Sequence, residues 1–461
     1  MKFFFDYRIF VLLYLSFIGM MGFGAIVKYN YDGGKKFQFL QKPVMLIAST
    51  PTTFKRMIKN KSIDDDVIVA INDIIYENLK VFDKKLFTPL PENLILISRY
   101  DGDLGKSIVE IRDLNTFEVL HSYKPNIEEI YKKIDLSKDE FKYLKRDKGV
   151  NKFYMWHPSI TNMGELIFQS SSPLIKIDFN SNVVWVNDED LFHHSTNLDD
   201  EENIYVPSQY RPYSKLVSNY VGVNNAIEKY NYEYNFEDDA INILDKNGKI
   251  LFSKSVAEIL IEHGYLNRIF SQASHKIDPI HLNDIQPVLK DTKYFKKGDV
   301  FLSLRNLSMV ILYRPSTNKI IKIIEGKFYN QHDVDIIDES RISIYNNNVF
   351  KNYKNERVVK NNVNEIVIYD FETNSFSKKF EKTFIENKIN SNSHGLVDFL
   401  QDGSAIVEDN NNGRIFYLNS QGEVVWIFNN LNSKKQVYNL WWARVIDLKK
   451  SKKIRELIKN D

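Results

Sequence analysis

The sequence predicts an all-β fold, a six-bladed β-propeller with a single N-terminal transmembrane helix and short helical insertions. Three observations predict it: a strand-turn-strand unit that occurs six times, a histidine that precedes an apolar run in five of these units, and a composition with 31 Phe and 26 Tyr. Aromatic and β-branched residues favour the pleated, half-buried surfaces of sheets. We therefore expect a protein built mainly of strands.

The strand-turn-strand unit consists of an apolar strand, a polar turn and a second apolar strand. Its six copies lie at residues 111–117, 177–183, 243–249, 312–318, 368–374 and 416–422. Each copy follows an apolar run that we interpret as the inner strand of the same unit, at residues 93–97, 165–169, 203–207, 299–303, 341–345 and 404–408. Six such units predict six blades around a central channel. A β-sandwich also contains short strands at regular spacing, but it does not explain a histidine at one repeated offset.

The repeated histidine precedes the inner run of every unit except the first. These residues are His157, His194, His281, His332 and His394. Because equivalent places in the blades of a propeller converge on its axis, the five imidazoles are predicted to form a ring. For His157, and for His121 outside the repeat, we favour a structural role, since neither lies in a polar string. Adjacent side chains of an extended segment point to opposite faces, so we expect His194 rather than His193 to face the axis.

The N-terminal segment predicts a membrane anchor. Residues 9–27 form an uncharged apolar run close to the ~20 residues that a helix needs to cross a bilayer. No small-residue cleavage site follows this run, so we expect an uncleaved signal anchor. The run is apolar on all sides, which disfavours a buried amphipathic helix. Basic residues flank both of its ends, so the positive-inside rule hardly decides the orientation.

These patterns divide the chain into four parts. We expect the anchor at residues 1–30, a stalk and entry segment at 31–90 with a strand-like stretch at 44–48, the propeller at 91–430, and a closing segment with a basic tail at 431–461. Apolar residues at three- and four-residue spacing predict helical insertions at residues 126–145 and 255–271. The Asn- and Lys-rich residues 346–364 are interpreted as a long polar surface loop without chemistry.

Charge and cysteine content exclude several classes of function. The 62 Lys and Arg balance 60 Asp and Glu, and a formal charge of +2 leaves no net field to drive nucleic-acid binding. The absence of cysteine excludes disulfides, thiolate zinc sites and a cysteine nucleophile. A metal site would need imidazoles together with Asp199 or Asp200, and Arg305 in the same pocket would repel the cation. We expect neither a metal nor a cofactor.

Four short strings contain most of the polar residues that could do chemistry. They are residues 192–199 (FHHSTNLD), 278–283 (DPIHLN), 303–306 (SLRN) and 331–333 (QHD). At these strings, and over most of residues 90–430, the sequence resembles the bacterial arylsulfate sulfotransferase (arylsulfotransferase) family. The resemblance implies a six-bladed propeller with a histidine-rich central funnel, in which His332 is the nucleophile. It also implies that His194, His281 and Arg305 line the sulfuryl pocket and that His394 lies nearby.

The chemistry of sulfuryl transfer suits these residue types. A neutral imidazole nitrogen is both a good nucleophile and a good leaving group, so one transfer can be split into two steps. Arg305 would hold the sulfuryl oxygens, while His194 or His281 would take the proton of a phenolic acceptor. Asn283 and Asp333 are predicted to orient imidazoles by hydrogen bonding.

The function expected from the sequence is a membrane-anchored sulfotransferase. It would move a sulfuryl group from an aryl sulfate donor to a phenolic acceptor through sulfo-His332, with a single-pass anchor and the propeller on the periplasmic or extracytoplasmic side. No glycine-rich phosphate loop followed by Lys is present, so no nucleotide donor is implied. Two alternatives are a non-catalytic anchored propeller that binds a ligand or protein partner through its funnel face, and a metal-dependent hydrolase or lyase.

Overall fold

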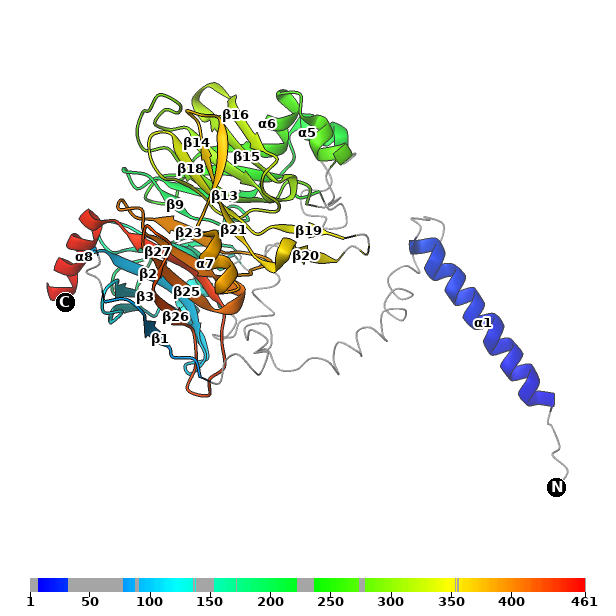
Figure 1. Ribbon diagram of the computed structural model, residues 1–461. Coiled ribbons are helices and arrows are strands. Elements are labelled where there is room, and N and C mark those ends of the chain that lie inside the picture. The colour runs from blue at the N-terminus through cyan, green and yellow to red at the C-terminus, as the bar shows by residue number, and fades with distance from the viewer. Residues whose placement is uncertain are drawn as a thin grey trace. The chain divides into compact units, whose positions relative to one another are not determined.

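Six antiparallel sheets, arranged as the blades of a propeller, form the main unit of the chain (Figure 1). The computed structural model describes residues 7–31, 78–87, 91–135, 137, 153–170, 172–221, 236–272, 278–352, 354 and 356–460. The predicted six-bladed propeller with an N-terminal apolar helix and short helices is thereby confirmed. The expected strand at residues 44–48 lies outside the described residues.

Each blade has four strands, numbered along the chain and ordered from the innermost strand outward. Blade 1 contains β27 (Leu440–Ile446), β2 (Leu94–Asp101), β3 (Lys106–Asp113) and β4 (Val119–Tyr123). Blade 2 contains β5 (Trp156–Ile160), β6 (Leu166–Gln169), β7 (Leu174–Ile177) and β8 (Val183–Asn187). Blade 3 contains β9 (Asn197–Leu198), β10 (Ile204–Gln209), β11 (Asp239–Leu244) and β12 (Ile250–Ser255).

The other three blades follow the same order. Blade 4 contains β13 (Leu282–Pro287), β14 (Val300–Leu304), β15 (Met309–Arg314) and β16 (Lys319–Glu325). Blade 5 contains β17 (Val334–Ile336), β18 (Arg341–Asn346), β21 (Glu365–Asp370) and β22 (Ser375–Lys379). Blade 6 contains β23 (Leu396–Phe399), β24 (Ala405–Asp409), β25 (Arg414–Leu418) and β26 (Val424–Asn429), with β1 (Phe82–Lys84) on its outer edge.

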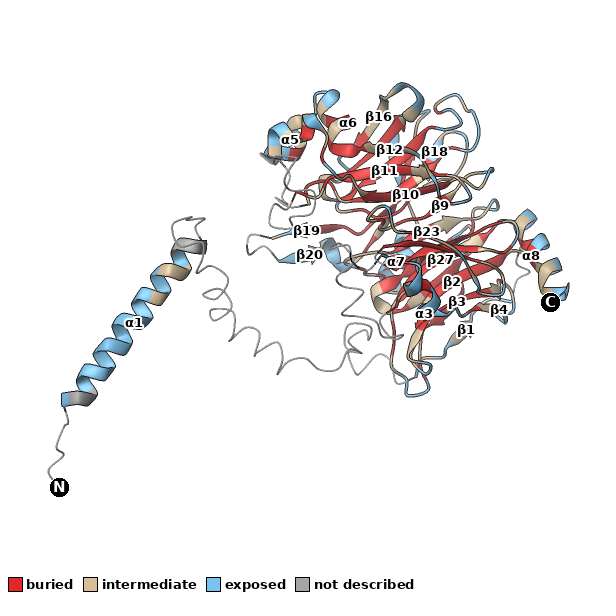
Figure 2. Ribbon diagram, turned by 180° about the vertical axis from the view of Figure 1, so that it is seen from behind, coloured by how far each residue is buried: buried red, intermediate tan, exposed pale blue. Residues whose placement is uncertain are grey.

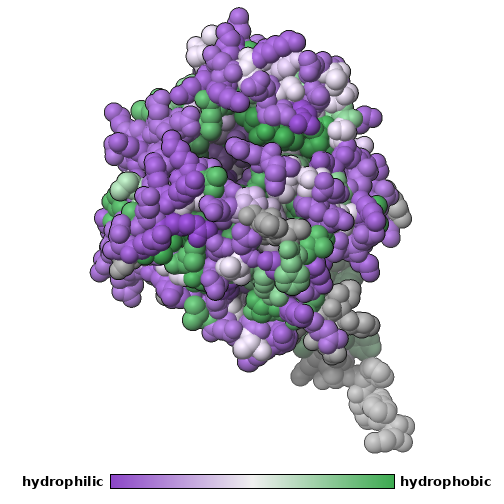
Figure 3. Space-filling view, turned by 60° about the vertical axis from the view of Figure 1, so that its left-hand side comes forward, coloured by the Kyte–Doolittle hydropathy of each residue, from purple (hydrophilic) through white to green (hydrophobic). Residues whose placement is uncertain are grey.

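Two pairings between distant parts of the chain close the ring of blades. The late strand β27 pairs antiparallel with β2, with Leu94 opposite Ile446. The early strand β1 pairs with β26, with Phe82 opposite Phe428. Closing the circle in this way leaves few exposed strand edges. Buried residues concentrate in the inner and middle strands, and the surface drawn in Figure 3 is mostly hydrophilic (Figures 2 and 3).

The innermost strands differ from those expected. The predicted inner runs are the second strands of their blades, and a further short strand lies closer to the axis in each blade. These innermost strands carry polar residues, as in β13 with the sequence LNDIQP, and β9 has only two residues. Strands that are this short and polar lack the apolar alternation by which a strand is recognised in a sequence.

Short helices interrupt the blades. They are α3 (Ile127–Lys132), α5 (Lys215–Val221), α6 (Val256–Glu262), α7 (Glu381–Glu386), α8 (Leu448–Asn460), a π-helical turn η4 (Arg268–Gln272), and the 3-10 turns η5 (Arg305–Leu307), η6 (Pro315–Thr317), η7 (Lys360–Asn362) and η8 (Asn410–Asn412). Asn126 caps α3 by accepting the Glu128 N–H at 3.0 Å, and Ser255 caps α6 by accepting the Glu258 N–H at 2.9 Å. Both caps agree with the predicted starts of the two helical insertions.

The segment interpreted as a polar surface loop folds differently. It contains a β-hairpin, β19 (Val349–Lys351) and β20 (Arg357–Val359), and asparagines at the base of the hairpin are buried. The Asn346 amide donates to Asn348 at 3.0 Å, and the Asn364 amide donates to the Asn347 carbonyl at 2.8 Å. An uncharged amide whose donors and acceptor are satisfied can be buried, so a run of Asn does not by itself indicate exposure.

The N-terminal helix α1 (Tyr7–Tyr31) belongs to a separate unit of the chain. Its stretch Phe10–Lys28 has a mean hydropathy of 2.2, and none of this stretch is buried. The helix is long and apolar enough to cross a membrane, and a signal sequence would share both properties. An N-terminal helix of this kind either anchors the protein or directs its secretion.

Candidate active site

Five histidines occupy equivalent places where the innermost strands of five consecutive blades begin. His157 lies within β5, and the other four directly precede or lie shortly before β9, β13, β17 and β23. Four of the five adopt a left-handed backbone with φ of 45° to 62°, namely His157, His194, His281 and His394. This conformation is uncommon for residues other than glycine, so its repetition indicates one shared local geometry. In blade 1 the residue Trp442, with φ of 121°, lies on the innermost strand β27.

The imidazoles converge as the sequence predicts. The ring centroids of His281 and His194 are 4.7 Å apart, those of His194 and His157 are 6.4 Å apart, and those of His157 and His394 are 6.4 Å apart. The centroid of His394 lies 5.8 Å from that of His332. We call these five side chains the histidine ring. The catalytic roles assigned to its members remain predictions.

Arg305 is a buried cation next to this ring. Its side chain follows β14 in the turn η5, and its backbone N–H donates to the His281 carbonyl at 3.0 Å. Residue Arg305 is 3 % exposed, its Nη1 donates to Asn306 Oδ1 at 2.9 Å, and its buried Nε has no hydrogen-bond partner among the described residues. Burial lowers the pKa of Arg305 to about 10, and the charge of Arg357 adds to this effect while Asp278 opposes it.

A buried guanidinium without a partner carboxylate is costly in free energy. No described carboxylate forms an ion pair with Arg305, and its open donors therefore remain available for an anion. A planar fork of N–H donors is the preferred receptor for the oxygens of sulfate- and phosphate-like groups.

Asn347 fixes the orientation of the His332 ring. The Asn347 Nδ2 donates to the carbonyls of Ser391 and His394 at 3.0 and 2.7 Å, and this leaves its Oδ1 facing His332 Nδ1 at 2.6 Å. Because Oδ1 can only accept, His332 Nδ1 must carry the hydrogen. His332 Nε2 is then the basic nitrogen, and it accepts the His394 backbone N–H at 3.1 Å. Asn347 was not predicted from the sequence, since it lies in the segment interpreted as a surface loop.

His332 is therefore held neutral. Residue His332 is 8 % exposed, and burial, the positive charge of Arg305 and the neighbouring His394 lower its pKa well below the usual value. The pKa values of His394 and His157 fall to about 4 and about 3, first because of burial. Neutral imidazole is the nucleophilic form, so the site keeps His332 ready to react at neutral pH.

This low pKa predicts an unusual pH dependence. The reactive form of His332 is lost only when the pH falls through its folded-state pKa, which lies well below 6.5. We expect the rate of sulfo-enzyme formation from an activated aryl sulfate to stay nearly constant from about pH 7.5 to about pH 5.5, where an ordinary imidazole would be ~90 % protonated. Single-turnover measurements across this range test the expectation, and a tenfold decline with a midpoint near 6.5 would contradict it.

The orientation of His332 yields a second prediction. The change Asn347→Ala removes the acceptor for His332 Nδ1–H, so the ring is free to rotate or to adopt the other tautomer. We expect sulfo-enzyme formation to slow by about 10–100-fold, as is common when a group that orients an imidazole is lost. Asn352→Ala, on the outer part of the same hairpin, is the matched control and should react like the wild type.

Asn283 and Asp333 take different places. The Asn283 amide donates to the Gln331 carbonyl at 2.9 Å, directly before His332, and its buried Oδ1 has no partner within the described part of the chain. Asp333 instead accepts the Val397 N–H of the next blade at 3.0 Å and lines a second cavity. Their predicted roles in substrate binding remain predictions.

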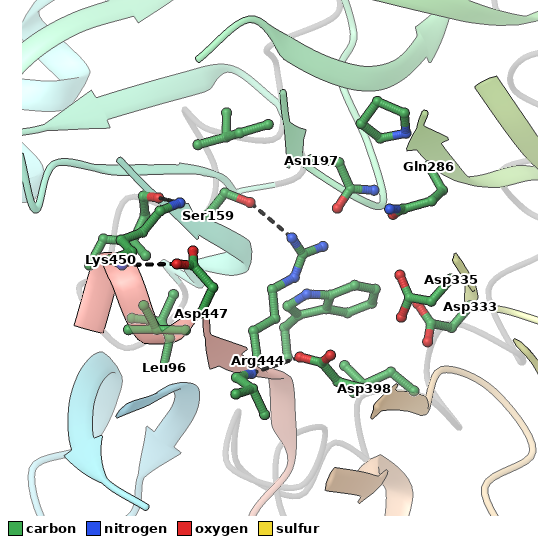
Figure 4. A pocket seen from close by; sticks show the side chains of 17 residues that line it. Leu96, Ser159, Asn197, Gln286, Asp333, Asp335, Asp398, Arg444, Asp447 and Lys450 are labelled. Carbon is green, nitrogen blue, oxygen red and sulfur yellow. Dashed lines mark hydrogen bonds between the residues drawn. The ribbon is translucent and has the colours of Figure 1, made fainter. Parts of the chain in front are cut away.

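The second cavity has a volume of about 240 Å³ and surrounds Arg444 on β27 (Figure 4). Asp333, Asp335 and Asp398 lie together on one side of it, and Arg444 Nη1 donates to Ser159 Oγ at 3.0 Å. Burial raises the pKa of Asp398 to about 6 and raises those of Asp333 and Asp335 well above their usual range. Among the residues with described positions, no group of His, Asp or Glu is arranged to hold a metal ion.

His193 and His194 are both part of the site, contrary to our expectation for an extended segment. The φ of 59° at His194 breaks the extended alternation. As a result His193 Nδ1 lies 2.7 Å from His194 Nδ1. His121, in contrast, lies on the outer strand β4, stacks on Phe179 at 3.8 Å and contacts the Phe179 carbonyl at 2.9 Å, so its predicted structural role is confirmed.

Together, the fold and the site define a propeller whose axial funnel can hold an anionic group between a buried arginine and neutral imidazoles. Residues 159–430 match the family model of the arylsulfotransferases (ASST). The chain therefore belongs to the arylsulfotransferase family, and it is a sulfotransferase rather than a non-catalytic propeller or a metal-dependent hydrolase.

The other comparisons add no functional information. No curated protein matches the chain. A protein of unknown function from Bacteroides caccae is 12 % identical over 77 % of this chain and 99 % of its own, with a TM-score of 0.44. TolB from Acinetobacter baumannii is 8 % identical over 77 % of this chain and 67 % of its own, with a TM-score of 0.40. The Pan2 WD40 domain of Neurospora crassa is 9 % identical over 78 % and 88 %, with a TM-score of 0.39.

Proposed function

We propose that this arylsulfotransferase moves a sulfuryl group from an aryl sulfate to a phenol by a two-step reaction through sulfo-His332. No nucleotide donor takes part. The observation that carries the proposal is the pairing of a neutral, oriented imidazole with a buried guanidinium that has no carboxylate partner among the described residues. The imidazole supplies the nucleophile, and the guanidinium supplies a receptor for the sulfuryl oxygens.

In the first step His332 Nε2 attacks the sulfur of the donor. The Nε2–S bond forms, the bond from sulfur to the aryl oxygen breaks, and the leaving phenolate takes up a proton. The His394 N–H must release the Nε2 lone pair before this attack. Arg305 holds the charge that spreads over the three sulfuryl oxygens.

In the second step a phenol takes the place of the leaving aryl group. Its oxygen attacks the sulfur, the Nε2–S bond breaks, and the phenolic proton passes to a histidine of the funnel. Asn347 assists because its Oδ1 accepts from Nδ1–H but cannot take up that proton. The sulfo-imidazole therefore keeps its Nδ1 proton and remains a good leaving group.

Detection of the covalent intermediate tests this function. The full chain in detergent would be mixed with a chromogenic aryl sulfate that carries an isotopic label on sulfur. We expect a burst of one phenol per protein, retention of the label on a peptide that contains His332, and loss of the label when a phenol is added. Label on no peptide, together with no transfer across a range of pH and acceptors, would overturn the proposal.

We also propose that α1 remains as a single-pass anchor and that the propeller lies on the periplasmic side. The long uncharged run Phe10–Lys28 and the mostly hydrophilic propeller surface support this arrangement. Cell fractionation followed by N-terminal sequencing separates the two uses of the helix. An intact N-terminus in the membrane fraction supports an anchor, and a released protein that begins after residue 27 contradicts it.

A further inference from the structure

Asp239, His193 and His194 form a continuous hydrogen-bonded chain on one side of the funnel. His193 Nε2 lies 3.3 Å from Asp239 Oδ1, and His193 Nδ1 lies 2.7 Å from His194 Nδ1. His194 is a neighbour of His281 in the histidine ring. The chain therefore runs from a carboxylate behind the ring to an imidazole within it.

The outer end of this chain is firmly held. Asp239 is the first residue of β11 and is 4 % exposed, and its second oxygen Oδ2 accepts the Leu282 N–H at 2.7 Å. Leu282 begins β13 in the next blade and directly follows His281. The carboxylate thus links two blades and presents its other oxygen to His193, as an acid that orients a histidine does.

The contact between the two rings allows two arrangements of one proton. In the first, His193 Nδ1 donates to His194 Nδ1, and a neutral His194 then carries its hydrogen on Nε2. In the second, His194 Nδ1 donates to His193, and His194 Nε2 is a free base. No described residue forms a hydrogen bond with His194 Nε2, so this nitrogen can act on a substrate.

We propose that Asp239, His193 and His194 form a proton relay that takes the proton from the phenolic acceptor and returns it to the leaving aryl oxygen of the donor. This inference rests on the proposed function. In the acceptor step the phenol O–H proton passes to His194 Nε2 while the His194 Nδ1 proton passes to His193 Nδ1. The phenol oxygen forms its bond to sulfur, and the Nε2–S bond to His332 breaks. In the donor step the same two protons move in the opposite direction.

The surroundings favour a positive charge on His193 over one on His194. Burial opposes the charged form of His193, but the hydrogen bond and charge of Asp239, together with the charge of Asp278, raise its pKa overall. Asp190 and Glu237 are further acidic groups that interact with His193, and His157 is a basic one.

The pKa of His194 is, in contrast, lowered well below its usual value by burial and by the neighbouring histidines His281 and His193. A proton that enters at His194 is therefore stabilised on His193.

His281 is the competing base, because its Nδ1 is hydrogen-bonded to Asp278. The experiment must separate the two. A series of phenols whose solution pKa runs from about 7 to about 10 would be used as acceptors for one activated aryl sulfate, with the full chain in detergent. The variants are His193→Gln, which can still hydrogen-bond to His194 but cannot carry a proton, and Asp239→Asn, which can still accept the Leu282 N–H. Asp278→Asn tests the competing pair.

We expect His193→Gln to reduce kcat/KM by about 10²-fold for the least acidic phenol and by less than tenfold for the most acidic one, because an ionised phenol needs no base. Asp239→Asn should shift the series in the same direction. His263→Gln, whose Nδ1 contacts the Ile259 carbonyl at 2.8 Å at the end of α6, is the matched control and should follow the wild type.

Three results would overturn the relay: an equal loss across all phenols, no loss, or a dependence on phenol acidity that steepens only in Asp278→Asn. Each of these would leave the proposed function intact if the wild type is still labelled on His332. Failure of the wild type to take up the sulfuryl label would instead overturn the proposed function, and the relay with it.

Discussion

Replacement of His332 by asparagine is expected to abolish sulfuryl transfer. The variant has no imidazole nitrogen that can form the bond to sulfur, so the covalent intermediate cannot arise. We expect turnover to fall by at least about 10⁴-fold, the scale of loss when a nucleophile is removed. The burst of phenol release and the labelled peptide should both disappear. Stopped-flow release of a chromogenic phenol measures the effect.

The fold should survive this change. Asparagine is polar and fits in the space of the ring, and a lost side-chain hydrogen bond costs only about 1 kcal/mol of stability. The melting temperature is therefore expected to shift by a few degrees at most. His263→Gln again serves as the control and should retain both the burst and turnover. A folded His332→Asn protein with transfer near the wild-type rate would assign the nucleophile to another histidine, first to His281 or His394.

The fold was largely predictable because the middle strands of each blade are apolar and joined by polar turns. The innermost strands were not predictable, since they face the crowded axis and carry polar residues such as Asp284 and Asp398, which accept the Val334 and Val445 N–H groups of neighbouring blades at 3.1 and 2.7 Å. A pattern based on apolar alternation assigns such strands to the turns between blades. The displaced assignment of the inner strands followed from this.

The histidine ring was predictable from its period, whereas the groups that orient it were not. Asn347 contacts the His394 carbonyl across 47 residues of sequence, and Asp239 contacts the Leu282 N–H across 43. Hydrogen bonds of this kind depend on which blades are neighbours and have no local signature. The positive φ of His194 was equally hidden, because nothing in the sequence distinguishes it from an extended histidine.

Replacement of Arg305 by lysine is expected to slow both half-reactions without abolishing them. Lysine keeps the positive charge but loses the planar fork of donors, so it can no longer hold two sulfuryl oxygens at once. We expect a loss of about 10²–10³-fold, the range seen when one donor to a developing anion is removed. Single-turnover labelling should show that the sulfo-enzyme still forms on His332, but slowly. This outcome separates a group that stabilises the transferred charge from the nucleophile itself.

Arg268→Lys is the matched control for this change, since Arg268 forms a partly exposed ion pair with Glu325 at 3.0 Å. It should leave transfer unaltered, because an exposed pair contributes little to stability and this one lies outside the funnel. Inorganic sulfate provides a second measurement: it should inhibit the wild type by occupying the open donors of Arg305, and it should inhibit Arg305→Lys more weakly. An Arg305→Lys protein that keeps both its rate and its sensitivity to sulfate would show that the sulfuryl oxygens are held elsewhere. The neutral imidazoles would then have to stabilise the charge, and their N–H donors on His194 and His281 would become the next groups to test.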